Sequence, residues 1–96
     1  MKKPVFLLFV FLITFFSFSQ DIKKQIAELD TAFHYGDYII AEKLVEKIYP
    51  GIAAVKNDTL VIEFLSTSGS VYYNLEKYTK AETFFLQAAE KAKSLF

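Results

Sequence analysis

The sequence predicts an all-α protein, and three observations carry that prediction. After residue 20 the apolar residues recur at steps of three and four, which is the spacing of one face of an α-helix. No segment alternates apolar and polar residues over the length of a strand. Short polar sequences, some containing Gly or Pro, divide the apolar pattern into four segments. We therefore expect four helices in this part of a chain of 96 residues.

The first 20 residues are typical of a bacterial secretory signal peptide. Two lysines precede a long apolar run, and the segment ends in small and polar residues. We predict a signal over residues 1–19, cleaved before Gln20 or, alternatively, before Asp21, and therefore export to the periplasm or the medium. A membrane anchor needs about 20 apolar residues, whereas residues 5–18 are a stretch of only 14 with Thr14 and Ser17 inside it. An uncleaved anchor and a buried core helix stay as the alternatives.

The charge and cysteine content restrict the partners of the exported part. Without the two N-terminal lysines the chain keeps 9 basic and 11 acidic residues, a net charge of about −2 with no basic stripe. We therefore expect no nucleic-acid partner, and contact with a membrane only transiently through the signal segment. The absence of cysteine suits an oxidising compartment and excludes disulfides and thiolate metal sites.

The first two helices precede and follow the sequence "YGDY", residues 35–38. Asp37 is placed to cap the second of them, and Pro50 should end or kink it because proline lacks a backbone donor. The residues predicted to face the core are Ile22, Ile26, Leu29 and Phe33 in the first helix and Ala41, Leu44, Val45 and Ile48 in the second.

The third helix contains "STSGS", residues 66–70, a cluster that normally marks a loop. Apolar residues flank the cluster on both sides, and a long flexible linker inside a compact domain is unusual. We therefore predict a continuous helix with one face of small side chains, on which a second helix can approach closely. Glycine in a helix interior costs about 1 kcal/mol relative to alanine, so packing must compensate for Gly69.

The fourth helix has the clearest periodicity. Thr79 and Glu82 have the spacing of a capping box at its start. Most charged residues lie off the apolar stripe, as expected for a solvated face. The predicted stripe consists of Ala81, Phe84, Phe85, Ala88, Ala89 and Ala92.

The two halves of the chain align at a spacing of 40 residues. Residues 32–48 align with residues 72–88, and a repeat of this length indicates a solenoid. The aligned pairs are Tyr38 with Tyr78, Ala41 with Ala81, Glu42 with Glu82, and Val45 with Phe85.

The second half resembles a tetratricopeptide repeat of the longer variant, because it carries that family's Gly, aromatic, small, aromatic and Ala positions in register. In the first half Leu29 stands at the Gly position and Ala32 at the aromatic position. The resemblance implies two tandem helix-turn-helix hairpins, about 21–50 and 58–96, forming an α-solenoid fragment within a domain over residues 20–96. It implies core packing for Tyr72 and Phe85. The repeat-packing residues are Tyr38, Ala41, Gly69, Tyr72, Tyr78, Ala81, Phe85 and Ala88.

The resemblance also implies which residues would line a groove for a partner: Phe33, His34, Glu63, Ser66, Ser70, Tyr73 and Asn74. The sequence contains no Gly-rich phosphate loop, metal-ligand cluster or nucleophile motif. His34, the one histidine, stands at a helix end and is interpreted as a surface or capping residue. We therefore predict no catalytic residue, cofactor, metal or small-molecule substrate.

The function predicted from these observations is an exported, non-enzymatic scaffold that binds a protein or peptide. The last helix continues to "KSLF" without a capping glycine or sealing helix, so we also expect a partner or self-association at this open end. The resemblance implies an alternative, the N-terminal sensory or regulatory region of a larger signalling enzyme or CHAT-type protease-like protein. A helical structural protein held at the membrane is a third possibility.

Overall fold

The computed structural model describes residues 21–95, and all regular structure in this range is helical. A helix over residues 21–34 is followed by α2 (Tyr38–Ile48), the 3-10 helix η1 (Tyr49–Ala54), α3 (Asp58–Asn74) and α4 (Tyr78–Lys93). The predicted all-α class is confirmed. The predicted signal over residues 1–19 lies outside the described residues.

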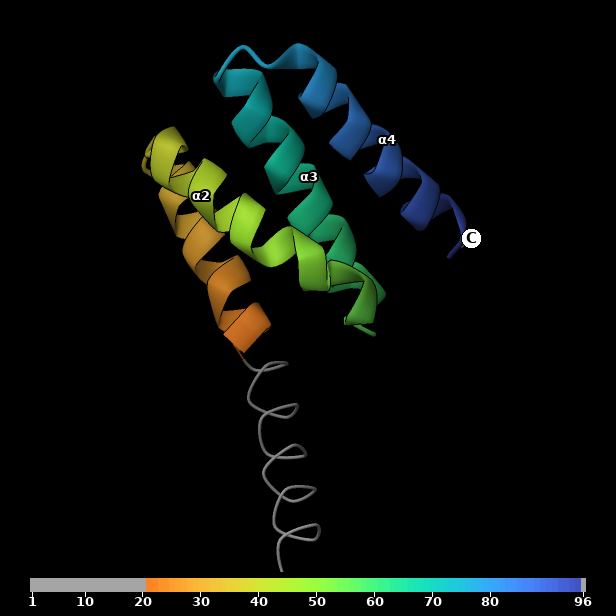
Figure 1. Cartoon of the computed structure of the whole chain (residues 1–96). Helices are drawn as coiled ribbons and strands as arrows, with labels where there is room; N and C mark the ends of the chain where they lie inside the picture. The colour runs from red at the N-terminus through yellow and green to blue at the C-terminus, as the bar shows by residue number, and fades with distance from the viewer. Residues whose placement is uncertain (1–20, 96) are drawn as a thin grey trace, which may run out of the picture.

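The helices of the described range pair into two hairpins, as Figure 1 shows. The helix over residues 21–34 and α2 form the first hairpin, and α3 and α4 form the second. In Figure 1 α3 lies between α2 and α4, and α4 forms the outer edge of the arrangement. Two different surfaces result, because α2 is covered by α3 whereas no described helix covers the outer side of α4.

The "STSGS" cluster lies inside α3, so the prediction of a continuous helix is confirmed. The Ser68 hydroxyl, fully buried, donates to the Phe64 carbonyl oxygen at 2.7 Å, and the Ser70 hydroxyl donates to the Ser66 carbonyl oxygen at 3.1 Å. Bonds of this kind satisfy a buried hydroxyl without a partner from another helix. A Cβ added to Gly69 would lie 2.7 Å from ring atoms of Phe85. The Phe85 ring therefore occupies the space that a side chain at position 69 would need.

The predicted apolar faces of the first hairpin are confirmed. In the helix over residues 21–34 the predicted positions are buried except Phe33, which is half-buried against the core. In α2 the predicted positions are buried except Leu44, which is also half-buried. Pro50 follows the end of α2 and lies in the first turn of η1, as its missing N–H predicts.

An aromatic cluster joins the two hairpins. Phe84 of α4 lies 5.1 Å from Tyr49 and 5.4 Å from Tyr72 between ring centroids, and Phe64 meets it edge-on at 6.5 Å. The Tyr49 hydroxyl donates to Oε1 of Gln87 at 3.2 Å, which gives this ring a polar partner on α4. Because Tyr49 follows directly after α2, the cluster fixes the end of the first hairpin against both helices of the second.

The turns of the two hairpins have the same hydrogen bonds at a spacing of 40 residues. The N–H of Asp37 donates to Ala32 at 2.9 Å, and the N–H of Lys77 donates to Tyr72 at 2.8 Å. The residue before each donor has a positive φ, 78° at Gly36 and 62° at Glu76. These are the features of a Schellman motif, in which a left-handed residue follows the helix end. The repeat seen in the sequence is therefore also a repeat of backbone conformation.

The predicted helix caps are wrong in two places. Asp37 occupies the N-cap position of α2, but its side chain makes no capping hydrogen bond. α4 begins at Tyr78 with Lys77 as its N-cap, so Thr79 already lies inside the helix and forms no capping box with Glu82. The turn explains the second difference, because the N–H of Lys77 is bonded to Tyr72 and the helix starts immediately after it. A side-chain cap is present on α3, where Asn57 Oδ1 accepts from the Leu60 N–H at 3.1 Å.

The apolar stripe of α4 is only half buried. Ala81, Phe84 and Ala88 lie in the core, whereas Ala89 is exposed and Phe85 keeps 40% of its side-chain surface exposed. The expectation that Phe85 lies in the core is therefore wrong, although Tyr72 is buried as predicted. The Phe85 ring still packs against Gly69 of α3, so this side chain lies at the border of the α3–α4 pair rather than in its core.

Candidate partner-binding surfaces

The groove candidates of the second hairpin lie along one side of α3. Ser66, Ser70, Tyr73 and Asn74 follow one another at helical spacing, and Glu63 lies one turn before them. Tyr73 is exposed, and its ring lies 5.3 Å from that of Tyr78 at the start of α4. The structure therefore brings these five residues onto one side of α3.

Two polar members of this group are bonded to their own helix. The Asn74 amide donates to the Ser70 carbonyl oxygen at 2.7 Å, and the Ser70 hydroxyl donates to Ser66. Their donors are occupied locally, so they contribute small size and smooth shape more readily than hydrogen bonds to a partner. Tyr73 is then the member of the group with the largest exposed surface.

The two groove candidates of the first hairpin differ in how exposed their side chains are. Phe33 is half-buried against the core and lies 5.8 Å from the Tyr38 ring, so much of its surface is already used. His34 is exposed, and its ring meets that of Tyr35 edge-on at 5.6 Å. The surface position predicted for His34 is thus confirmed.

A carboxyl pair marks the line where the first helix meets α3. Asp30 accepts a hydrogen bond from the Thr67 hydroxyl at 3.1 Å. A hydrogen bond between the Glu63 carboxyl and Asp30 raises the pKa of Glu63 above its ordinary value, and burial and the Asp30 charge act in the same direction. Two neighbouring carboxylates disfavour each other's ionisation. The pair therefore weakens this contact at neutral pH, while the Thr67 bond holds it.

Several residues of the second hairpin are less buried than their equivalents in the first hairpin, 40 residues earlier in the sequence. Ile22, Ile26 and Val45 are buried in the first hairpin, but their equivalents Ile62 and Ser66 are only half-buried and Phe85 is exposed. We define the open face as Ile62, Ser66, Tyr73, Phe85 and Ala89. Its residues belong to α3 and α4, and α4 forms the outer edge of the arrangement in Figure 1.

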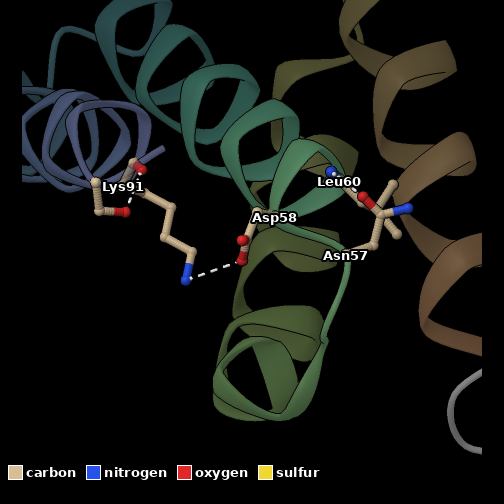
Figure 2. Close-up of polar contacts among 5 residues, drawn as sticks. Asn57, Asp58, Leu60 and Lys91 are labelled. Carbon is tan, nitrogen blue, oxygen red and sulfur yellow. Dashed lines mark hydrogen bonds and ion pairs between the residues drawn. The ribbon is translucent and has the colours of Figure 1, made fainter. Parts of the chain in front are cut away.

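The far end of the second hairpin is closed by polar contacts, which Figure 2 shows. Lys91 Nζ lies 3.1 Å from Asp58 Oδ1, so the last turns of α4 are tied to the first residue of α3. Beside this pair a shallow depression is lined by Ile52, Val61, Leu65 and the polar rim of α4. It is open to solvent, and the polar side chains that line it include Gln87, Glu90 and Lys91.

Two features of the described residues concern metal binding and membrane spanning. No group of three or more His, Cys, Asp or Glu side chains within residues 21–95 is arranged to hold a metal ion. Of the helices in the described range, none has the length and apolar character needed to cross a bilayer. Burial raises the pKa of Tyr72, with the charges of Glu42 and Glu46 acting in the same direction, so this phenol stays protonated.

No protein-family model matches the chain, and no curated protein or solved structure is significantly similar to it.

Sequence reasoning missed the residues that join the hairpins by charge. Glu42 Oε2 lies 2.6 Å from Lys77 Nζ, which binds α2 to the turn before α4. The 40-residue repeat pairs Glu42 with Glu82, and this repeated acidic position was the sign in the sequence that pointed to Glu42. Ile62 was missed as a surface residue because it lies inside the apolar run that predicted the core of α3.

Proposed function

We propose that this chain is an exported, non-enzymatic protein–protein interaction module built from two hairpins of the tetratricopeptide repeat type. The observation that carries the proposal is the set of large apolar side chains exposed on the second hairpin, with Tyr73 58%, Leu86 56% and Phe85 40% exposed. The exposed Tyr73 ring also lies 5.3 Å from the exposed Tyr78 ring, and adjoining exposed apolar side chains on a small domain are typical of an interaction site. The equal turns of the two hairpins support the repeat assignment.

A site-specific cross-linking experiment tests the interaction. A photoreactive phenylalanine analogue replaces Tyr73 in the full chain, and the same analogue replaces Lys43, an exposed residue of α2, as a matched control. We expect an adduct of defined mass from position 73 and none from position 43. An absence of adducts at both positions, or equal labelling at both, would contradict a specific protein-binding surface.

Export is tested by the mass of the protein. We expect the chain recovered outside the cytoplasm to begin at Gln20 or Asp21, as the composition of the preceding residues predicts. Recovery of a chain that keeps residues 1–19 would favour an anchored protein. The interaction proposal does not depend on this result, because the open face lies within residues 62–89.

A further inference from the structure

We propose that the open face receives a single amphipathic α-helix of a partner protein, seated on the second hairpin as α3 is seated on the first, with a lysine or arginine against Glu82. This inference rests on the proposed interaction function and specifies the partner that one surface takes. Four groups of observations support it: the cover of the first hairpin, the shape of the open face, its charge, and the polarity of the opposite end.

The first hairpin provides the pattern, because its equivalent face is already covered. Ile26, Leu29 and Val45, the equivalents of Ser66, Gly69 and Phe85, are almost completely buried. The covering segment is α3 with the turn that follows it. Thr67 of α3 bonds Asp30 at 3.1 Å, and Lys77 of that turn pairs with Glu42 at 2.6 Å. α3 and its following turn thus supply these polar contacts, and Phe84 and Gln87 of α4 add contacts to Tyr49 at the end of α2.

The shape of the open face fits the same kind of cover. Ser66 and Ala89 are small, and the Phe85 ring lies flat enough on Gly69 to leave no room for a Cβ there. Small side chains beside one broad ring allow a helix to approach closely and pack its own side chains around the ring. An extended peptide would gain less, since the described part of the chain has no strand edge with free backbone groups.

The charge at the edge of the open face specifies part of the partner's sequence. Glu82 occupies the position equivalent to Glu42, 40 residues later. Glu42 is half-buried by its pairing with Lys77, whereas Glu82 is exposed and has no ion-pair partner among residues 21–95. A basic residue one turn beyond the partner helix would reproduce the pair, and such complementarity fixes register more than affinity.

The outer surface of the first helix argues against a second copy stacked head to tail. In that arrangement the first helix of the copy would take the place of α3. Its residues equivalent to the apolar contacts Val61, Phe64 and Val71 are Asp21, Lys24 and Thr31, all exposed and polar. Placing them on Phe85 and Ala89 would bury charges without partners, which is costly. The occupant is therefore a helix with an apolar face of its own.

A peptide with the sequence of residues 58–77 is the probe, because it carries the chemistry of α3 and the basic residue that follows it. Its binding to the full chain is measured by fluorescence anisotropy. We expect saturable binding that Phe85→Ala weakens by about tenfold or more, as for a central aromatic anchor. Ala89→Lys places a charge on the exposed side of α4 without touching the core, and should have a similar effect. Ile39→Ala, an exposed apolar residue of α2, is the matched control and should leave binding unchanged.

A charge exchange tests the orientation of the bound helix. Glu82→Lys should weaken binding by roughly threefold, and a peptide carrying Lys77→Glu should recover that loss. Binding that is absent, or equally strong in the Phe85→Ala and Ala89→Lys chains, would overturn the proposal. A dimer of the full chain that Phe85→Ala dissociates would also overturn it in favour of a second copy.

The failure of this proposal differs from the failure of the interaction function. If cross-linking at position 73 gives an adduct that persists in the Phe85→Ala and Ala89→Lys chains, the chain binds a protein elsewhere on its surface and the helix proposal is wrong. If cross-linking gives no adduct while the peptide binds through Phe85, the surface takes a helix but the cellular interaction is contradicted.

Discussion

The two hairpins share the backbone conformation of their turns but differ in the side chains at their centres. At the close-packed position of the first helix the first hairpin has Leu29, which is fully buried, and faces it with the medium-sized Val45 in the register of α2. The second hairpin has Gly69 there and the large Phe85 in the equivalent place on α4, with the ring directly over the glycine. The larger side chain is on the first helix in one hairpin and on the second helix in the other. The comparison teaches that the two hairpins share a turn, and that either helix of a hairpin can supply the large side chain at its centre.

The largest expected effect comes from a comparison of two single variants, in which the central residue of each hairpin, Leu29 or Gly69, is replaced by alanine. Leu29→Ala removes a fully buried side chain and should lower the free energy of unfolding by about 3 kcal/mol. Gly69→Ala should also destabilise the chain, but by less than Leu29→Ala, because the added Cβ would lie 2.7 Å from ring atoms of Phe85 and must displace them, while a gain of about 1 kcal/mol in helix propensity offsets part of that cost.

Urea unfolding of the full chain, followed by circular dichroism, measures both changes. Val45→Ala serves as a control on the partner helix of the first hairpin, and should also be destabilising because Val45 is buried. If Gly69→Ala costs as much as Leu29→Ala, then Phe85 is held rigidly and the two hairpins are closer in mechanics than their sequences indicate.

The turns give a second comparison of opposite sign. Gly36 and Glu76 both have positive φ, which glycine adopts freely and other L-residues adopt at a cost of about 1 kcal/mol. We expect Gly36→Ala to lower the melting temperature and Glu76→Gly to raise it. No atom lies within 4 Å of a Cβ built on Gly36, so a loss there reports backbone strain alone.

The N-caps of α3 and α2 give a third comparison. The expected loss of stability on removing the side chain is about 1 kcal/mol at the N-cap of α3 and near zero at the N-cap of α2. Asn57→Ala removes the oxygen that accepts from the Leu60 N–H and should cost about 1 kcal/mol of stability. Asp37→Ala removes a side chain with no capping bond and should leave the unfolding midpoint nearly unchanged. An equal loss in both variants would indicate that Asp37 caps α2 in solution.

Periodicity predicted the helices well because it records which residues share a face. It could place Phe85 and Ala89 on the same stripe as Ala81, but it could not tell whether another element covers that side of α4. Burial depends on neighbours that the stripe does not contain. The continuity of α3 was predictable for a related reason, since apolar residues on both sides of "STSGS" make a loop costly.

Local motifs predicted less than the repeat did. The Thr79 and Glu82 pair has the spacing of a capping box, but the backbone bond from Lys77 to Tyr72 starts α4 earlier and decides the matter. The candidate site shows the same limit. Residue spacing could place Ser70 and Asn74 on one side of α3, but not show that each donates to its own helix backbone.

The smallest expected effect is a pH dependence at the line between the first helix and α3. Glu63 occupies the position equivalent to Lys23, and it is Glu63 that meets Asp30. The hydrogen bond to Asp30 raises the pKa of Glu63 in the folded chain above its ordinary value of 4.5, while the unfolded chain keeps the ordinary value. Folding therefore favours the protonated carboxyl. The stability that protonation contributes is fully present below pH 4.5 and is lost as the pH rises through the raised pKa.

Glu63→Gln should consequently stabilise the chain at pH 7 and lose its advantage below pH 4.5. The gain should be about 0.5 kcal/mol or less, because Glu63 is largely exposed and water screens the pair. Unfolding midpoints of both chains at several pH values measure it, and Glu28→Gln, an exposed carboxylate of the first helix, is the control. A gain for Glu63→Gln that is independent of pH would mean that Asp30 does not act on this carboxyl. A gain confined to neutral pH would instead show that the two hairpins meet along a line where charge opposes the contact, while the Thr67 bond and the buried apolar residues maintain it.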